Sequence, residues 1–109
     1  MATDYNGWTN YETWAVNLWL MNDQGSADYW YEVAEHIYEE SEADHPFTRD
    51  EIAERMVAAQ LKDEIAESSP LAEDASMYSD LLTAALGEVN YNEIARHLVE
   101  SVKEARLDV

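Results

Sequence analysis

Two Glu/His pairs are the residues whose types and spacing come nearest to those of a reactive site, here a metal site. In each pair the glutamate stands four residues before the histidine. Glu32 precedes His36, and Glu93 precedes His97. A spacing of four places both side chains on one face of a helix, so two facing pairs would offer a metal ion carboxylate and imidazole ligands. Carboxylate-bridged metal bundles instead use Glu-x-x-His, and Glu93 is also placed to cap a helix. We therefore expect ordinary surface histidines, with no metal ion and no cofactor.

Other catalytic constellations are missing from the sequence. The chain has no cysteine and no Gly-x-Ser-x-Gly turn, and its three glycines are isolated. These absences argue against thiol chemistry, a hydrolase nucleophile and a phosphate-binding loop. Carboxylates are so abundant that no particular pair points to acid–base catalysis, which stays open as a lesser alternative. We expect a protein that is not an enzyme.

Net charge is the most informative property of the composition. Twenty-four acidic residues stand against six basic ones, giving −18, and residues 1–48 hold ten acids and no base. Such a chain repels nucleic acids and anionic lipids and attracts basic surfaces. We therefore expect a protein partner with a basic surface and no direct binding to nucleic acid.

The length and the apolar segments indicate one domain, residues 1–109, outside membranes. A chain of 109 residues without repeats fits a single domain. No apolar run exceeds four residues, the length of residues 18–21, which is far too short to span a bilayer. The opening MATDYNGW lacks the basic and apolar regions of a secretory signal. We expect a cytoplasmic protein.

Apolar residues recur at intervals of three and four, and runs of period two are absent, which predicts an all-α fold. Chain breaks and capping residues divide the sequence into a compact bundle of about five helices, over residues 10–22, 26–42, 48–67, 76–86 and 90–105. Three capping boxes are predicted at helix starts: Thr9 with Glu12, Thr48 with Glu51, and Asn90 with Glu93.

The same spacing predicts which side chains the last three helices bury. The third helix is expected to bury Ile52, Met56, Val57, Leu61 and Ile65. The fourth is expected to bury Met77, Leu81, Leu82 and Ala85. The fifth is expected to bury Ile94, Ala95, Leu98, Val99 and Val102.

An acidic stripe on the second predicted helix is the first candidate for partner binding. It lies opposite the apolar face and consists of Asp28, Glu32, Glu35, Glu39 and Glu42. Residues 28–44 hold seven acids in 17 residues. At a rise of about 1.5 Å per residue this is about one charge per 3.4 Å, close to the phosphate spacing of one DNA strand. The plainer interpretations are a solvated face or adaptation of the whole protein to high salt.

Aromatic residues gather in the N-terminal part of the chain. No lysine or arginine accompanies them before Arg49, which argues against single-strand nucleic-acid binding by base stacking. Most of these rings are expected to pack in or near the core. Trp8 and Trp19 lie off the best apolar face and are the predicted partner anchors, since tryptophan is common at interface hot spots.

Two blocks of sequence resemble a group of small uncharacterised proteins found mainly in phages, plasmids and mobile regions of bacterial and archaeal genomes. The first is NGWTNYETW at residues 6–14, followed by Asn17-Leu18-Trp19 and Asn22-Asp23. The second is YSDLLTAALGEVNYNEIA at residues 78–95. The resemblance implies a mobile-element setting and a cytoplasmic protein, and it implies no activity and no catalytic residues. The first block is interpreted either as a fold determinant or as a recognition surface.

Charge and setting together suggest a function. We expect an inhibitor or nucleic-acid-mimicking decoy of a host nucleic-acid-handling protein, of the restriction or CRISPR type. The alternative is an accessory interaction domain of unknown target whose acidity reflects a salty habitat. A decoy should concentrate its charge on one connected surface, whereas salt adaptation should spread it evenly.

Overall fold

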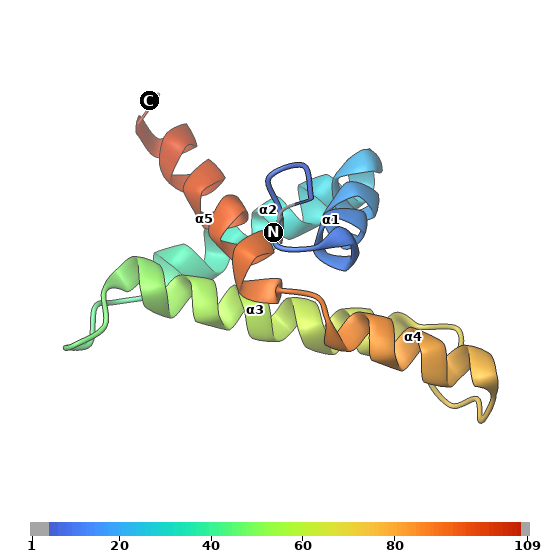
Figure 1. Ribbon diagram of the computed structural model, residues 1–109. Helices are drawn as coiled ribbons and strands as arrows, with labels where there is room; N and C mark the ends of the chain where they lie inside the picture. Colours follow the sequence, from blue (N-terminus) through green and yellow to red (C-terminus); the bar gives the residue numbers. More distant parts are fainter. Residues whose placement is uncertain (1–4, 108–109) are drawn as a thin grey trace.

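Five α-helices form the structure, a computed structural model that describes residues 5–107 (Figure 1). They are α1 (Tyr11–Asn22), α2 (Gln24–Glu40), α3 (Arg49–Ser68), α4 (Met77–Gly87) and α5 (Tyr91–Leu107). Over the described residues the only β-type pairings are two isolated bridges, Tyr5–Trp8 and Asp44–Phe47. The predicted all-α fold is confirmed. None of these five helices combines the length and the apolarity needed to cross a membrane.

The core lies where α5 packs against α3 and α2. The predicted inner face of α5 is confirmed, because Ile94, Ala95, Leu98, Val99 and Val102 are all buried. They meet Trp30, Ala34 and Ile37 of α2 and Ala53, Val57 and Leu61 of α3 in one cluster. Apolar residues three or four apart form a single stripe on each helix, and burying the three stripes together supplies the main stabilisation.

The start of α3 is confirmed in full. The Thr48 hydroxyl accepts a hydrogen bond from the Glu51 backbone N–H at 3.1 Å, and the Glu51 carboxylate accepts one from the Thr48 N–H at 2.9 Å. This reciprocal pair satisfies two backbone donors that the first turn leaves without helical partners.

The start of α1 differs from the prediction by one residue. Asn10, not Thr9, is the N-cap, and its side-chain oxygen accepts from the Thr13 N–H at 2.9 Å. The predicted box between Thr9 and Glu12 is therefore wrong. The Thr9 N–H donates instead to the Glu93 carboxylate, which belongs to α5.

The two ends of α2 also differ from the prediction. Asp23 caps the helix by accepting from the Ser26 N–H at 2.8 Å, so α2 begins two residues early and Gly25 lies inside its first turn. At the other end Ser41 turns extended, and its hydroxyl donates to the Ile37 carbonyl at 2.7 Å. The helix stops at Glu40, which leaves the predicted stripe residue Glu42 outside it.

A polar clasp joins the start of α1 to the start of α5. Thr13 is fully buried, its hydroxyl accepts from the Asn90 N–H at 2.8 Å, and the same hydroxyl donates to the Asn10 side chain at 2.6 Å. The Asn10 amide donates to the Glu88 carbonyl at 2.7 Å, and Glu93 accepts from the Thr9 N–H at 3.0 Å. We call these six residues, Thr9, Asn10, Thr13, Glu88, Asn90 and Glu93, the clasp.

The clasp corrects the predicted capping box of α5. Asn90 does cap the helix, because its side-chain oxygen accepts from the Glu93 N–H at 3.1 Å. The second bond of a capping box, from the Asn90 N–H to the Glu93 carboxylate, is absent. The Glu93 carboxylate instead accepts from the Thr9 N–H, and the Asn90 N–H instead donates to the Thr13 hydroxyl. Both groups of the predicted box therefore join α5 to the start of α1.

The prediction for α4 is wrong at two positions. Met77 and Leu81 are 64% and 61% exposed, and the helix buries only the small side chain of Ser79. Together with the C-terminal half of α3, α4 extends away from the group formed by α1, α2 and α5 (Figure 1). On α3, Met56 is also exposed, whereas Val57 and Leu61 are buried as predicted.

Candidate partner-binding surface

Four carboxylates of the predicted acidic stripe line the solvent face of α2. They are Asp28, Glu32, Glu35 and Glu39, and we call them the α2 ridge. Their positions advance by four, three and four residues, which keeps them on one side of the helix, opposite buried Trp30, Ala34 and Ile37. Asp28, Glu32 and Glu39 are exposed, and Glu35 is partly buried at the edge.

The ridge is only partly neutralised by neighbouring groups. Glu39 accepts from the Arg106 guanidinium at 2.9 Å, and Asp28 accepts from the Gln24 amide at 2.8 Å. Within residues 5–107 the ion pairs are Arg106–Glu39 and Lys103–Asp50, so neither Glu32 nor Glu35 takes part in one. The ridge therefore presents net negative charge to solvent.

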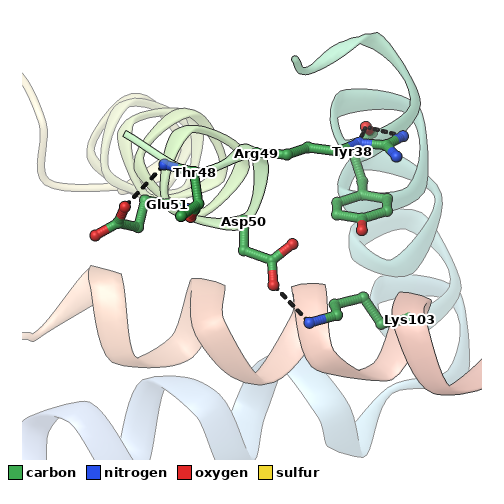
Figure 2. Close-up of polar contacts among 6 residues, drawn as sticks. All are labelled: Tyr38, Thr48, Arg49, Asp50, Glu51 and Lys103. Atoms are coloured by element: carbon green, nitrogen blue, oxygen red, sulfur yellow. Dashed lines mark hydrogen bonds and ion pairs between the residues drawn. The ribbon is translucent and has the colours of Figure 1, made fainter. Parts of the chain in front are cut away.

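Basic residues are gathered where α2 ends, α3 begins and α5 passes both, and Figure 2 shows this junction. The Arg49 guanidinium lies over the Tyr38 ring, 4.0 Å from its centroid, and also donates to the Tyr38 backbone carbonyl at 2.8 Å. Lys103 pairs with Asp50, and the hydrogen bond and charge of that carboxylate raise the pKa of Lys103. The Arg106 guanidinium also lies beside the Tyr38 ring, at 5.3 Å.

The junction has a structural explanation. Arg49 donates to the Tyr38 carbonyl in the last turn of α2, which otherwise accepts only the 3.3 Å bond from the Ser41 N–H, and it stacks on an aromatic ring at the same time. Lys103 and Arg106 attach α5 to α3 and α2. Half of the six basic residues are thus engaged in holding three helices together, and one of them, Arg106, does so by pairing with Glu39 of the ridge.

Charge is divided unevenly along the chain. Residues 49–62 contain three acids and three bases, and residues 96–109 again contain three and three. Residues 63–95 contain eight acids and no base, like the base-free first 48 residues. The N-terminal part of α3 and most of α5, which pack on each other, are consequently neutral in sum. The net charge belongs to α1, α2, the end of α3, and α4.

The two predicted tryptophan anchors have different surroundings. Trp19 is 77% exposed on α1, as an anchor requires. Trp8 is half-buried, packs against the core, and stacks on the His97 ring with centroids 4.4 Å apart. It follows the Asn6-Gly7 turn, where both residues have positive φ, and this turn folds Trp8 back onto α5. Trp19 is therefore the better placed of the two.

The residues of the two Glu/His pairs considered for metal binding have different contacts. The Glu93 carboxylate is part of the clasp, and His97 lies against Trp8. His36 is exposed on α2 beside Glu32. Across the described part of the chain, no three histidine or carboxylate side chains are grouped so as to hold a metal ion.

Sequence reasoning did not find two features of the structure. The clasp connects residues about 80 positions apart, and its one local signal was a threonine at a buried position of α1. The exposed side of α4 was also missed. That helix is apolar around most of its circumference, so the spacing of its apolar residues only weakly indicated which side faces the bundle, and it placed Met77 and Leu81 on the wrong side.

Fold and surface together define a small, strongly acidic, all-helical protein. Over residues 1–105 the chain matches the model of a family of unknown function (DUF7249), and it belongs to that family. Neither the curated proteins nor the solved structures include a match to it.

Proposed function

We propose that this protein is a non-catalytic inhibitor that enters the nucleic-acid groove of a basic partner and excludes the nucleic acid. The observation that supports this is the α2 ridge, a straight row of carboxylates on the helix face opposite the core. The four ridge carboxylates, over residues 28–39, recur about every 5.5 Å along the helix axis, a regular negative row with wider spacing than the distance of about 3.4 Å between phosphates along one DNA strand.

The surroundings of the ridge support the same proposal. Three of the six basic residues lie at the α2–α3–α5 junction, and among the ion pairs of residues 5–107 only Arg106–Glu39 involves a ridge carboxylate. The resemblance to mobile-element proteins suggests the partner class, a restriction or CRISPR-type defence protein of the host. Exposed Trp19 on α1 would add an apolar anchor beside the charged contact.

The second candidate is an accessory interaction domain whose acidity is an adaptation to salt. It is favoured by the eight carboxylates in residues 63–95, which extend the negative charge well beyond the ridge. It is disfavoured by the neutral pairing of the N-terminal part of α3 with α5, because adaptation of the whole surface should not spare one part of it.

Competition tests the proposal directly. Purified restriction endonucleases and CRISPR nucleases, each carrying a fluorescent duplex, are titrated with this protein while DNA release is followed by anisotropy. We expect release from at least one of them, and added DNA should in turn displace the protein. Release from none, or binding alongside DNA without competition, would show that the ridge is solvated surface.

A matched pair of variants then separates the ridge from general acidity. Asp28→Asn, Glu32→Gln and Glu35→Gln together remove three charges from the ridge and leave Glu39 with Arg106. Asp63→Asn, Glu67→Gln and Glu104→Gln remove three exposed charges elsewhere. The ridge variant should associate more slowly with the partner, and the control should resemble wild type at equal salt. Equal slowing in both would favour non-specific charge attraction.

A further inference from the structure

The outer side of α4 is a second surface that the fold leaves uncovered. Met77, Tyr78 and Leu81 are 64%, 66% and 61% exposed, and we call them the α4 patch. Met77 and Leu81 stand four residues apart, one turn above the other, on the side of the helix away from buried Ser79. Neighbouring exposed apolar side chains of this size, on one short helix, are typical of a binding surface.

The inner side of α4 rests loosely on the rest of the molecule. An open pocket of about 360 Å³ lies between it and α1, α2 and α3, lined by Leu20, Trp30, Ile65, Leu82 and Leu86 among others. A second open pocket of about 440 Å³ is formed by α4, α3 and the loop that joins them. The outer side of α4 is therefore a surface distinct from the pockets on its inner side.

The charge around the α4 patch indicates what kind of partner it fits. No lysine or arginine occurs between Lys62 and Arg96, whereas Glu73, Asp74 and Asp80 precede or accompany the patch and Glu88 follows it. We call these four carboxylates the acidic rim. A second copy of this chain would place the acidic rim against its own counterpart, since a two-fold interface pairs a surface with its own copy. Like charges set opposite each other oppose such a dimer.

We infer that the α4 patch docks an amphipathic helix of another protein, with apolar side chains along one face and lysine or arginine on both sides of it. The apolar face covers Met77, Tyr78 and Leu81, and the basic flanks meet the acidic rim. This site is separate from the α2 ridge and does not depend on the proposed decoy function.

Two synthetic helical peptides of the same composition test the inference. In the first, leucines recur at intervals of three and four with lysines elsewhere. In the second, the same residues are reordered so that no face is apolar. Affinities are measured by calorimetry in 0.5 M salt, where non-specific charge attraction is reduced. We expect the patterned peptide to bind at least tenfold more tightly, and equal binding of the two would overturn the inference.

Variants locate the binding on the molecule. Leu81→Ser and Met77→Ser should each abolish most of the preference for the patterned peptide while leaving helicity unchanged, because both side chains are exposed. Met56→Ser, on the half-exposed methionine of α3, is the matched control and should keep the preference. If all three variants, or none of them, lose it, the peptide binds elsewhere.

Two further measurements test the basic charge of the partner and the alternative that a second copy of this chain covers the α4 patch. A patterned peptide with glutamate in place of lysine should bind at least tenfold more weakly than the lysine peptide, and equal affinity would remove the basic partner from the proposal. Sedimentation of the protein alone should show a monomer. A dimer that Leu81→Ser dissociates would mean that the patch belongs to a second copy.

Discussion

Thr13 and Asn90 are 77 residues apart in sequence and share a 2.8 Å hydrogen bond from the Asn90 N–H to the fully buried Thr13 hydroxyl. The same hydroxyl donates to Asn10. One small side chain therefore connects the cap of the first helix to the cap of the last.

Replacing Thr13 with valine should destabilise the fold by about 1–3 kcal/mol. Valine has the same shape but provides neither the acceptor for Asn90 nor the donor to Asn10, and it leaves the Asn90 N–H without its partner. Urea unfolding measures the loss. Thr83→Val, at an exposed position of α4, is the control and should change little. An unchanged free energy of unfolding for Thr13→Val would show that the clasp contributes no stability.

Thr48→Ala should lower the free energy of unfolding by about 0.5–2 kcal/mol, because it removes the hydroxyl that caps α3. The Glu51 carboxylate would keep its bond from the residue 48 N–H, so half of the capping box survives. Thr48→Ser preserves the hydroxyl and should recover most of the loss. If serine is as harmful as alanine, the contribution of Thr48 lies in its methyl group and not in the cap.

Glu51 should make the protein less stable in acid. Hydrogen bonds from Thr48 hold the pKa of Glu51 below its ordinary value of 4.5, so the ionised carboxylate is favoured by folding. Its contribution is fully present above pH 4.5 and is lost as the pH falls through the lower pKa of the folded state. Glu51→Gln should therefore be less stable than wild type near pH 7, and the difference should shrink toward pH 3. A difference that is constant with pH would contradict this assignment.

Glu54, three residues after Glu51 on α3, should affect the pH dependence of stability in the opposite direction. Desolvation, with nearby acids including Asp50, raises the pKa of Glu54, so the folded state disfavours its charge. Glu54→Gln should gain stability relative to wild type as the pH rises through that raised pKa, and the gain should disappear in acid. Thermal melts of wild type and both variants across pH 3–7 measure the two effects side by side. A Glu54 variant that is less stable at pH 7 would show that attraction to Arg96 outweighs burial.

Salt should raise the melting temperature. Self-repulsion at a net charge of −18 penalises the folded state, and ions screen exposed charges over about 10 Å at 0.1 M. We expect a steady rise from low salt that levels off once screening is complete. A melting temperature that stays constant or falls with added salt would mean that charge repulsion contributes little to the stability. A rise that continues well above 1 M would favour the salt-adapted alternative over the decoy.

Local signals in the sequence predicted the structure well. The Thr48 cap is confirmed because every group in it belongs to four consecutive residues. The buried stripe of α5 is confirmed because its opposite face is polar, which leaves one way to orient the helix. The Asn90 cap is half correct, since its own bond to the Glu93 N–H is local and the second bond is not.

Most of the wrong predictions depended on distant partners, although the Asp23 cap of α2 is local and was also missed. Thr9 is not the N-cap because the Asn10 side chain accepts from the Thr13 N–H. The N–H and hydroxyl of Thr9 instead bond to Glu93 and Asn90 near the other end of the chain. Glu42 left the acidic stripe because Ser41 and Arg49 use the last carbonyls of α2. For the α2 ridge itself, the sequence correctly indicated the solvent-facing side of the helix, but whether a partner binds there stays a prediction.

The clasp also determines when this protein can finish folding during synthesis. The ribosome makes Asn90 77 residues after Thr13, and at about 5–20 residues per second that interval is roughly 4–15 s. Throughout it, the hydroxyl of Thr13 has no Asn90 to bind, and the Thr9 amide has no Glu93. The hydrogen bonds that hold the start of α1 are thus completed only when the start of α5 has been made. In a nascent chain stalled in α4, α1 would still lack them.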